Sequence, residues 1–291
     1  MKKLVLLGSG ATHFKSKIPF AELVEVKKFP DGETYVKINS EVKNKNVVYI
    51  QCFFPEQNEK LIESFLTIDT LRDLKAKKVD LIATYLPYTR QDKRFLEGEA
   101  LSLKTTIKLF NGVSIDTIFT INTHFLKEPG RYDVFGMKIV NLDTTPLLVD
   151  YIKGSYKDFV AVAPDEGAKH LVENFENHIV LKKERGNYVT EKLITERKVE
   201  RIEGKLEIKA KKAIIIDDMI STGGTIAEAC KFLKSKGIHD VDCICIHGLF
   251  VSDSIKRLKN CGINKIVTTD TIPSKFSKIS VFPVLSEIIK S

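Results

Sequence analysis

The chain has no long hydrophobic run, and this absence excludes the simplest kind of membrane protein. No apolar segment among its 291 residues reaches the ~18 that a membrane-spanning helix needs. The start, MKKLVLLGSG, has a short apolar run that Gly8 and Gly10 interrupt, so a strand ending in a turn is favoured over a signal peptide. We therefore expect no membrane partner. With 43% hydrophobic and 29% charged residues, a chain of this length is expected to form two globular domains.

Paired-cysteine motifs are also missing. The five cysteines are odd in number and include no C-x-x-C pair, which argues against a zinc site or a disulfide framework. Cys243 and Cys245 alternate in VDCICIH, as residues on one face of a buried strand do. Packed free thiols are predicted, and they fit a reducing, cytoplasmic location.

The charge is basic but not concentrated. The net charge of +8 comes from lysines spread along the chain, and no aromatic-basic RNA-binding motif is present. Basic chains bind anionic partners. We therefore expect an anionic small molecule as the ligand and no nucleic-acid partner.

Short apolar runs alternate with helical patterns. The runs 3–10, 46–54, 78–87 and 116–124 are typical of strands, and 59–78 is apolar at helical spacing. Strands that alternate with helices predict parallel βαβ units and an α/β fold.

The second half of the chain repeats the order of the first. Elements matched in order lie roughly 150 to 165 residues apart, which indicates a duplicated fold. Segments 3–12, 23–33, 46–57, 59–78, 79–88 and 116–124 correspond to 159–168, 178–187, 213–225, 224–236, 241–250 and 264–272. We predict domains at 1–141 and 142–291, with the last helix packing on the first domain.

The segment 213–225, AIIIDDMISTGGT, carries the clearest chemistry. A strand expected at 213–216 delivers Asp217 and Asp218 to the carboxyl edge of a parallel sheet, where ligands bind. The following glycine loop (residues 221–225) leads into a helix, whose first N–H groups attract a phosphate. The two carboxylates could accept hydrogen bonds from the hydroxyls of a sugar, or bind a metal ion that those hydroxyls coordinate. A capped turn with solvated aspartates is the alternative; the combination favours a ribose 5-phosphate site.

The corresponding segment of the first half lacks these groups. Gln51 and Cys52 stand at the position of the acidic pair, and PEQNE stands at the position of STGGT. Only the second domain is therefore expected to bind the sugar phosphate.

The string IIIDDMISTGGT resembles the phosphoribosyl-pyrophosphate loop of type I phosphoribosyltransferases and of ribose-phosphate pyrophosphokinases. The segment RQDK within 85–102 resembles the ATP-binding segment of the pyrophosphokinases, which ordinary phosphoribosyltransferases lack. This resemblance implies two type I phosphoribosyltransferase-like domains, each a mostly parallel sheet flanked by helices, with a small flap in the second. It is closest to a compact, archaeal-like form.

The resemblance assigns roles to individual residues. The loop FPDGE would reach a neighbouring subunit's nucleotide site, with Phe29 on the adenine, so an oligomer is implied. The expected ATP-binding residues are Phe29, Asp31, Glu33, Arg90, Gln91, Asp92 and Lys93. The expected ribose 5-phosphate-binding residues are Asp217, Asp218, Ser221, Thr222, Gly223, Gly224 and Thr225.

The remaining assignments concern the metal and the catalytic residues. His124 and Asp165 match the family's positions near Mg²⁺–ATP, and Mg²⁺ is the expected cofactor. The chain departs at Asn122, where an aspartate is frequent, and at 166–168, Glu-Gly-Ala, where Gly-Gly is usual, which makes metal geometry there less defined. The charged flap 182–212 begins with KKER, which resembles the catalytic flexible loop of the family. By this resemblance, Lys183 and Arg185 would be catalytic residues that close over the transferring group.

The resemblance implies a ribose-phosphate pyrophosphokinase. Such an enzyme transfers the β,γ-diphosphoryl group of ATP to the 1-hydroxyl of ribose 5-phosphate and releases AMP. Two alternatives stay open: a phosphoribosyltransferase that uses a nucleobase, and a non-catalytic subunit associated with such a synthetase.

Overall fold

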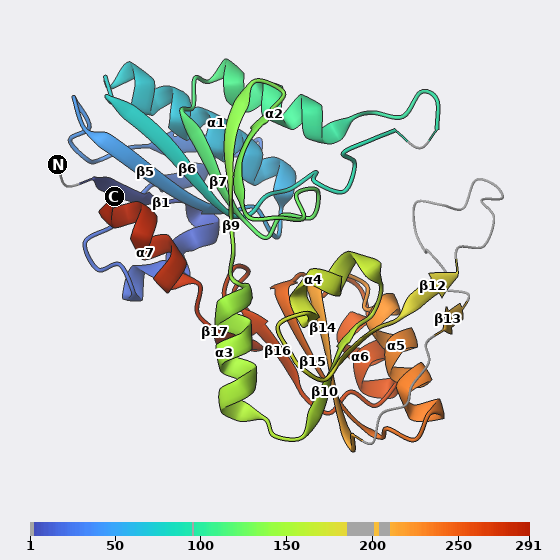
Figure 1. The fold of residues 1–291 in the computed structure, drawn as a ribbon. Helices are drawn as coiled ribbons and strands as arrows, with labels where there is room; N and C mark the ends of the chain where they lie inside the picture. The colour runs from blue at the N-terminus through green and yellow to red at the C-terminus, as the bar shows by residue number, and fades with distance from the viewer. Residues whose placement is uncertain (1–2, 95, 185–200, 204–209) are drawn as a thin grey trace. The chain divides into compact units, whose positions relative to one another are not determined.

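The computed structural model describes residues 3–94, 96–184, 201–203 and 210–291. The fold consists of two compact units, each a mostly parallel sheet with helices (Figure 1). The first unit comprises Met1–Thr144, Thr271–Pro273 and Val281–Ser291, and the second comprises Thr145–Asp270 and Ser274–Ser280. The domain boundary suggested at 141 and 142 remains a prediction. In the part of the chain that is described, no helix is both long enough and apolar enough to cross a bilayer.

The first unit contains a seven-stranded sheet with the order β2-β1-β5-β6-β7-β9-β8. Its neighbouring strands are parallel, except for the edge pair β8–β9. A separate antiparallel hairpin consists of β3 (Glu25–Lys28) and β4 (Thr34–Lys37). The strands of the sheet are β1 (Leu4–Leu7), β2 (Glu22–Leu23), β5 (Asn46–Cys52), β6 (Lys78–Tyr85), β7 (Thr117–Ile121), β8 (Gly130–Val134) and β9 (Met137–Leu142).

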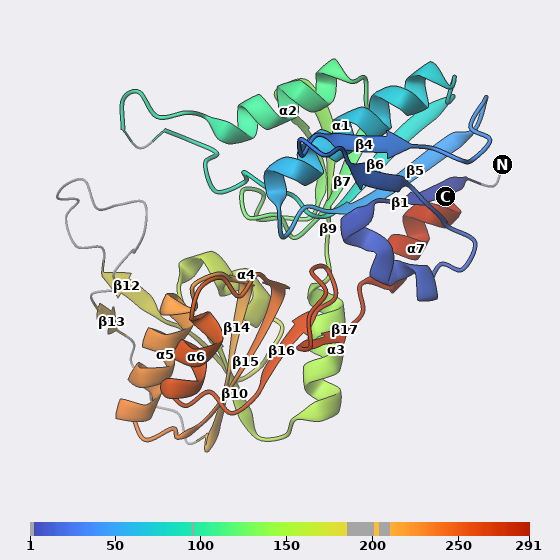
Figure 2. The ribbon, with the colours of Figure 1, turned by 180° about the vertical axis from the view of Figure 1, so that it is seen from behind.

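Two long helices cover one face of this sheet. The connections from β5 to β6 and from β6 to β7 place α1 (Gln57–Asp73) and α2 (Ser102–Gly112) on the same side, as right-handed crossovers require (Figure 2). The Phe110 ring packs edge-on against Phe65, with centroids 5.0 Å apart. The short helix η1 (Ser9–Ser16) lies on the opposite side of the sheet.

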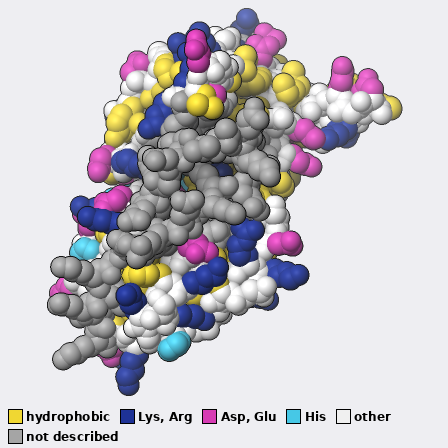
Figure 3. Space-filling model, turned by 90° about the vertical axis from the view of Figure 1, so that its right-hand side faces the viewer, with side chains coloured by type: hydrophobic (Ala, Val, Ile, Leu, Met, Phe, Trp, Pro, Cys, Tyr) yellow, Lys and Arg dark blue, Asp and Glu magenta, His cyan; other side chains and the backbone are white. Residues whose placement is uncertain are grey.

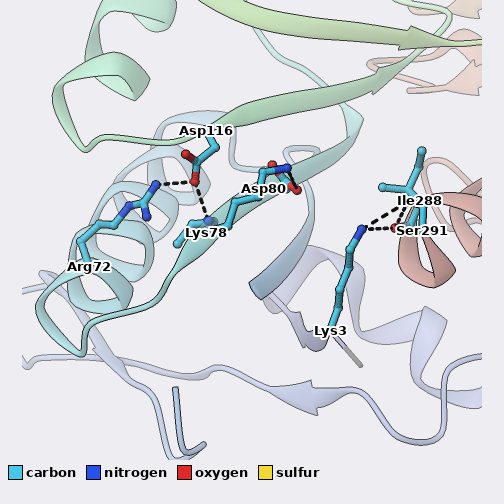
Figure 4. Close-up of polar contacts among 8 residues, drawn as sticks. Lys3, Arg72, Lys78, Asp80, Asp116, Ile288 and Ser291 are labelled. Carbon is cyan, nitrogen blue, oxygen red and sulfur yellow. Dashed lines mark hydrogen bonds and ion pairs between the residues drawn. The ribbon is translucent and has the colours of Figure 1, made fainter. Parts of the chain in front are cut away.

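The last helix, α7 (Phe282–Lys290), belongs to the first unit. Lys3 Nζ donates a hydrogen bond to the Ile288 carbonyl at 2.7 Å (Figure 4). Near the amino end of β6, Arg72 forms an ion pair with Asp116 at 2.6 Å. These contacts join the ends of elements that are far apart in sequence.

The second unit contains a six-stranded, fully parallel sheet with the order β11-β10-β14-β15-β16-β17. A separate antiparallel pair, β12 (Lys182–Glu184) and β13 (Arg201–Glu203), starts the flap. The sheet strands are β10 (Phe159–Ala163), β11 (His178–Val180), β14 (Lys212–Ile220), β15 (Asp240–Gly248), β16 (Ile266–Thr269) and β17 (Ser277–Ile279).

Helices α5 (Gly224–Ser235) and α6 (Ser254–Asn260) cover one face of this sheet, and α3 (Thr145–Ser155) covers the other (Figures 1 and 2). The short helices η2 (Glu166–Ala168) and α4 (Lys169–Val172) follow β10. Ile215, Ile226 and Leu233 contribute to the core beneath α5. An amphipathic α5 thus places its first turn at the carboxyl edge of the sheet.

The two units share one topology, which confirms the predicted duplication and the α/β fold class. In chain order, β1, β2, β5, β6, β7 and β9 occupy the places that β10, β11, β14, β15, β16 and β17 occupy in the second sheet. Each unit also has a two-stranded hairpin after its second strand. The edge strand β8 occurs in the first sheet and has no counterpart in the second sheet as described.

Several predicted boundaries were wrong, and the structure explains three of them. β14 continues through Asp217 to Ile220, because β15 goes on pairing with it beyond Ile216. β7 ends at Ile121, because Asn122 adopts a left-handed φ of 35°. The helix expected at 59–78 ends at Asp73, and Lys75 with φ 62° turns the chain toward β6.

Figure 3 shows one face of the molecule. The described Lys and Arg side chains on it lie among acidic, hydrophobic and uncharged side chains. The positive charge on this face is mixed with other side-chain types, as the even distribution of lysine in the sequence suggests.

Candidate functional site

The glycine loop joins β14 to α5 at the carboxyl edge of the second sheet. Gly223 is the residue before α5, and its φ of 73° is one that favours glycine. The Gly223 carbonyl accepts the Ala227 N–H at 2.9 Å, so the helix begins immediately after it. The N–H groups of a first helical turn have no partner within the helix. A loop of this geometry presents donors and a partial positive charge, which suit an anion.

Two elements pack against this loop, namely the segment that follows β15 and the helix α6. The Ile220 carbonyl accepts the Leu249 N–H at 2.9 Å, and the Ser221 carbonyl accepts the Val251 N–H at 3.2 Å. A β-carbon built on Gly223 would lie 3.3 Å from the Leu258 side chain of α6. The loop backbone is thus packed closely against its support.

Arg257 was missed by sequence reasoning. It lies on the exposed side of α6, and its Nη1 donates to the Thr222 carbonyl at 3.2 Å. The same nitrogen lies 3.8 Å from where a β-carbon on Gly224 would stand. A single arginine in a charged helix carries no local signal of this contact. The structure places a guanidinium beside a loop that has no lysine of its own.

Three carboxylates gather beside the loop. Asp217 and Asp218 are half-buried in β14, and Asp165 follows β10. Burial raises the pKa of Asp217 well above its usual range, and the charges of Asp218 and Asp165 raise it further. The Asp217 carboxylate accepts the Asp218 N–H at 2.9 Å, and the Asp165 carboxylate accepts the Gly167 N–H at 2.8 Å.

This acidic group has the donor chemistry that Mg²⁺ prefers. Mg²⁺ keeps several waters and is often held by one or two carboxylates together with substrate phosphates. Among the described residues, no three His, Cys, Asp or Glu side chains are arranged to hold a metal ion by themselves. The crowded carboxylates fit a cation that arrives with its substrate.

The corresponding place in the first unit is filled by its own side chains. Gln51 is fully buried, and its Nε2 donates to the Glu63 carboxylate at 2.8 Å. Gln51 Oε1 accepts the Gly10 N–H at 2.9 Å. A β-carbon on Gly8 would lie 2.5 Å from the Tyr49 hydroxyl. No open acidic edge like that of the second unit remains at these residues.

The predicted nucleotide residues of the hairpin lie at its exposed tip. Phe29, Asp31 and Glu33 are all exposed, and the Phe29 N–H donates to the Glu33 carbonyl at 2.8 Å. The Phe29 ring packs edge-on against Tyr35, with centroids 5.7 Å apart. The tip therefore presents an aromatic ring beside two carboxylates.

The RQDK segment lies in the loop between β6 and α2. Gln91 anchors it, because its side chain accepts a hydrogen bond from the Ser102 hydroxyl and its carbonyl accepts the Leu103 N–H at 3.3 Å. Arg90 and Lys93 are exposed, and Asp92 is half-buried.

The first turn of α1 holds both of these elements. Lys28 of the hairpin forms an ion pair with Glu59, and Tyr88 of the RQDK loop donates to Asn58. The structure thus attaches the predicted nucleotide residues of the two segments to one helix terminus.

His124 is exposed in the turn after β7, in the first unit, whereas Asp165 belongs to the second. Their joint role at a metal stays a prediction. The departure at Asn122 has a structural use: its Oδ1 accepts the Thr144 N–H at 2.8 Å, and its Nδ2 donates to Asp143 at 3.2 Å. Asn122 braces the chain after β9.

The flap is described only at its base. Lys183 pairs with Ile202 in the β12–β13 ladder. The Lys183 side chain and the whole of Arg185 lie outside the described residues, so the predicted catalytic roles stay predictions.

Comparisons with known proteins agree with this arrangement. Residues 15–113 match the model of the N-terminal domain of ribose phosphate pyrophosphokinase, and residues 176–286 match that of the phosphoribosyl synthetase-associated domain. Ribose-phosphate pyrophosphokinase from Sulfolobus acidocaldarius is 33% identical over 298 residues, covering 99% of each chain. The Sulfurisphaera tokodaii protein of the same name is 34% identical with the same coverage.

A solved structure resembles the whole chain. The crystal structure of phosphoribosylpyrophosphate synthetase from Mycobacterium smegmatis covers 99% of this chain and 98% of its own, with a TM-score of 0.81 and 26% identity. The duplicated fold, the acidic pair before the glycine loop and the full-length similarity agree with one another. The chain belongs to the ribose-phosphate pyrophosphokinase family.

Proposed function

We propose that the chain transfers the β,γ-diphosphoryl group of ATP to the 1-hydroxyl of ribose 5-phosphate, giving 5-phosphoribosyl 1-pyrophosphate and AMP. The observation that carries this proposal is the asymmetry between the two units. One has an acidic pair beside an anion-binding helix terminus, and the other has filled the same place with Gln51 and Glu63. Family membership makes the chain an enzyme that forms phosphoribosyl pyrophosphate.

The second unit would bind ribose 5-phosphate. The glycine loop would hold the phosphate through the first N–H groups of α5 and the hydroxyls of Ser221, Thr222 and Thr225. Asp217 and Asp218 would accept hydrogen bonds from the 2- and 3-hydroxyls. A sugar with hydroxyls at one end and a phosphate at the other matches the polarity of this edge of the sheet.

The first unit would bind ATP. Arg90 and Lys93 would bind its phosphates, because a guanidinium binds oxygens bidentately and an ammonium acts as a point charge. Gln91 and Asp92 complete this segment. The hairpin residues Phe29, Asp31 and Glu33 would contact the nucleotide, and we propose that they do so across a subunit boundary in a homo-oligomer.

Mg²⁺ is the proposed cofactor. His124 and Asp165 would lie near it when it binds with ATP, and the carboxylates beside the glycine loop have the ligand chemistry it prefers. When bound, the ion would neutralise phosphate charge.

The chain's own residues would position the reactants and stabilise charge. Phosphoryl transfer depends mainly on positioning and electrostatic stabilisation. Asp217 and Asp218 orient the ribose so that its 1-hydroxyl faces the β-phosphorus in line. Lys183 and Arg185, from the flap, would cover the transferring group, balance its negative charge and exclude water.

An assay with two arms separates this function from its alternatives. Incubation with ribose 5-phosphate and Mg²⁺–ATP should release AMP in step with phosphoribosyl pyrophosphate. Pyrophosphate release from phosphoribosyl pyrophosphate plus a nucleobase, with no AMP in the first arm, would identify a phosphoribosyltransferase instead. No turnover in either arm would identify a non-catalytic associated subunit. We propose a cytoplasmic location, which the free thiols and the biosynthetic family support.

A further inference from the structure

Two cysteines of the second unit lie side by side behind the glycine loop. Cys230 is buried in α5, Cys261 follows the last residue of α6, and both are free thiols. Cys230 Sγ donates to the Cys261 carbonyl at 3.2 Å, and Cys261 Sγ donates to the Leu258 carbonyl at 3.1 Å, so the two residues are in direct contact. A disulfide between them requires the two sulfur atoms to approach each other.

The surroundings make Cys261 the reactive member of the pair. Cys261 is partly exposed, whereas Cys230 is fully buried. A β-carbon built on Gly262 would lie 1.7 Å from Lys234 Nζ, so an ammonium group lies against the residue that follows Cys261. The neighbouring Cys230 thiol and the Lys234 charge lower the pKa of Cys261 to about 7 despite its partial burial. Reactive thiols are those with this kind of electropositive, accessible setting.

The other cysteines have the opposite setting. Cys52, Cys243 and Cys245 are fully buried in strands, and burial raises the pKa of each thiol. Burial also contributes to a raised pKa at Cys230, after its hydrogen bond to Cys261. Such thiols react slowly with oxidants until a neighbouring sulfur has already been oxidised.

We propose that Cys230 and Cys261 form a redox-active pair, which a peroxide converts into an intramolecular disulfide between α5 and the end of α6. The Cys261 thiolate attacks one peroxide oxygen, forming a sulfenic acid and releasing hydroxide. The Cys230 sulfur then attacks the sulfenic sulfur, and its proton leaves with the displaced hydroxide as water. Two thiols and one hydrogen peroxide thus give one disulfide and two waters.

The chain around Cys261 can accommodate the new bond. A disulfide brings two sulfur atoms to about 2.05 Å, so one helix must shift slightly toward the other. Cys261 is beyond the last turn of the short helix α6, and Gly262 with φ 86° follows it. Both helices contribute to the same core, α5 through Leu233 and α6 through Leu258, so an approach of the two sulfur atoms also shifts the packing of α6.

A shift of α6 would change the contacts that this helix makes with the glycine loop. Arg257 and Cys261 are four residues apart in sequence, so they face the same side of α6. Arg257 donates to the Thr222 carbonyl, and Leu258 packs against Gly223. Drawing Cys261 onto α5 therefore displaces the two side chains that support the loop. This second part of the inference rests on the proposed function, because it concerns the binding of ribose 5-phosphate.

The modification itself is tested without any activity assay. The full chain is treated with hydrogen peroxide, denatured, alkylated and mapped by mass spectrometry. Two of the five thiols should be lost, with a mass decrease of about 2 Da and one Cys230–Cys261 cross-linked peptide. Cys230→Ser should stop at a sulfenic acid on Cys261 that a dimedone probe captures, and Cys261→Ser should keep its four thiols. Lys234→Met should slow the oxidation of Cys261.

Three outcomes would overturn the proposal. They are five unreacted thiols under conditions that oxidise an exposed control thiol, a different intramolecular pairing, or a disulfide-linked dimer through Cys261. Each is read from the same peptide map and is independent of what the enzyme catalyses.

The effect on the loop is measured next, with the oxidised and reduced forms of the same protein. Oxidation should raise the KM for ribose 5-phosphate several-fold, and dithiothreitol should restore it. Cys230→Ser should show no such change. An unchanged KM in fully oxidised protein would overturn the link to the loop. Absence of turnover in both forms would instead count against the proposed function, while the peptide map would still decide the thiol pair.

Discussion

Glu63 accepts hydrogen bonds from both the backbone N–H and the hydroxyl of Ser9. Its carboxylate, on α1, thereby fixes the turn after β1, and it also accepts from Gln51 at 2.8 Å and from the Tyr49 hydroxyl at 3.2 Å. The carboxylate is almost completely buried, with 3% of Glu63 exposed. This cluster occupies the place in the first unit that corresponds to the proposed ribose-binding edge of the second unit.

Glu63→Ala should destabilise the chain by about 2–4 kcal/mol, because it leaves several buried donors without an acceptor. Urea unfolding followed by circular dichroism measures this as a lower midpoint. Glu59→Ala on the same helix is the control, because exposed ion pairs such as Lys28–Glu59 contribute at most about 1 kcal/mol. Equal midpoints for the two variants would contradict the structural role of Glu63.

Gly223→Ala should weaken ribose 5-phosphate binding as well as stability. Alanine at this position would have to adopt a left-handed conformation, which costs roughly 1–2 kcal/mol. Its β-carbon would also lie 3.3 Å from the Leu258 side chain. Gly237→Ala is a matched control, since Gly237 has φ 88° and nothing within 4 Å of its β-carbon position. Both variants should melt lower, but only Gly223→Ala should raise the KM for ribose 5-phosphate. Similar KM values for the two variants would show that the glycine loop does not contribute to ribose 5-phosphate binding.

Arg257→Ala should raise the KM for ribose 5-phosphate by about three- to tenfold and leave kcat nearly unchanged, because it removes a charge-assisted hydrogen bond to an exposed loop. Steady-state kinetics with Lys256→Ala, an exposed neighbour on the same helix, provides the comparison. A fall in kcat with a constant KM would show that Arg257 acts on the transfer step and not on the loop.

Asp217→Asn should raise the melting temperature of the substrate-free chain at neutral pH. The pKa of Asp217 is raised by folding, so the folded state binds more protons than the unfolded state at pH values between the two pKa values. Its contribution to stability is therefore largest below about pH 4, the unfolded pKa, and is lost as the pH rises toward the folded pKa. Wild type and variant should differ little at pH 4, and the variant should be the more stable at pH 7–8.

The measurement is a melting series without Mg²⁺, with Asp253→Asn as a control for the simple loss of one negative charge. The same Asp217→Asn variant should lose ribose 5-phosphate binding, because an amide is a weaker acceptor for the sugar hydroxyls. A variant less stable than wild type at pH 8 would contradict the inference that burial and the charges of Asp218 and Asp165 disfavour the ionised form of Asp217.

Lys183→Ala should lower kcat by roughly two to three orders of magnitude, as loss of a group that stabilises transition-state charge does, and should leave ATP binding almost unchanged. Lys182→Ala, the exposed neighbour in β12, is the matched control. Single-turnover kinetics and nucleotide titration separate the two effects. A mild effect on turnover would remove Lys183 from the catalytic residues.

The strand, loop and helix of the candidate site could be predicted because their signals are local. The string AIIIDDMISTGGT contains a buried strand, two carboxylates and a loop before a helix, all within a few residues of one another. The glycine loop was placed correctly for this reason. The end of β14 was not, because it depends on how far β15 continues beside it. Local sequence also cannot reveal that Asn122 braces Thr144.

The sequence by itself determined the duplicated α/β order and the position of the acidic pair and glycine loop, since periodicity and turn chemistry are properties of short segments. Only the tertiary structure decided that Arg257 supports Thr222, that Cys230 meets Cys261, and that Glu63 fills the first unit's equivalent site. These contacts join residues from separate helices, strands and turns. They form because sheet pairing and helix packing bring those segments together, and no pattern within a single segment encodes the meeting.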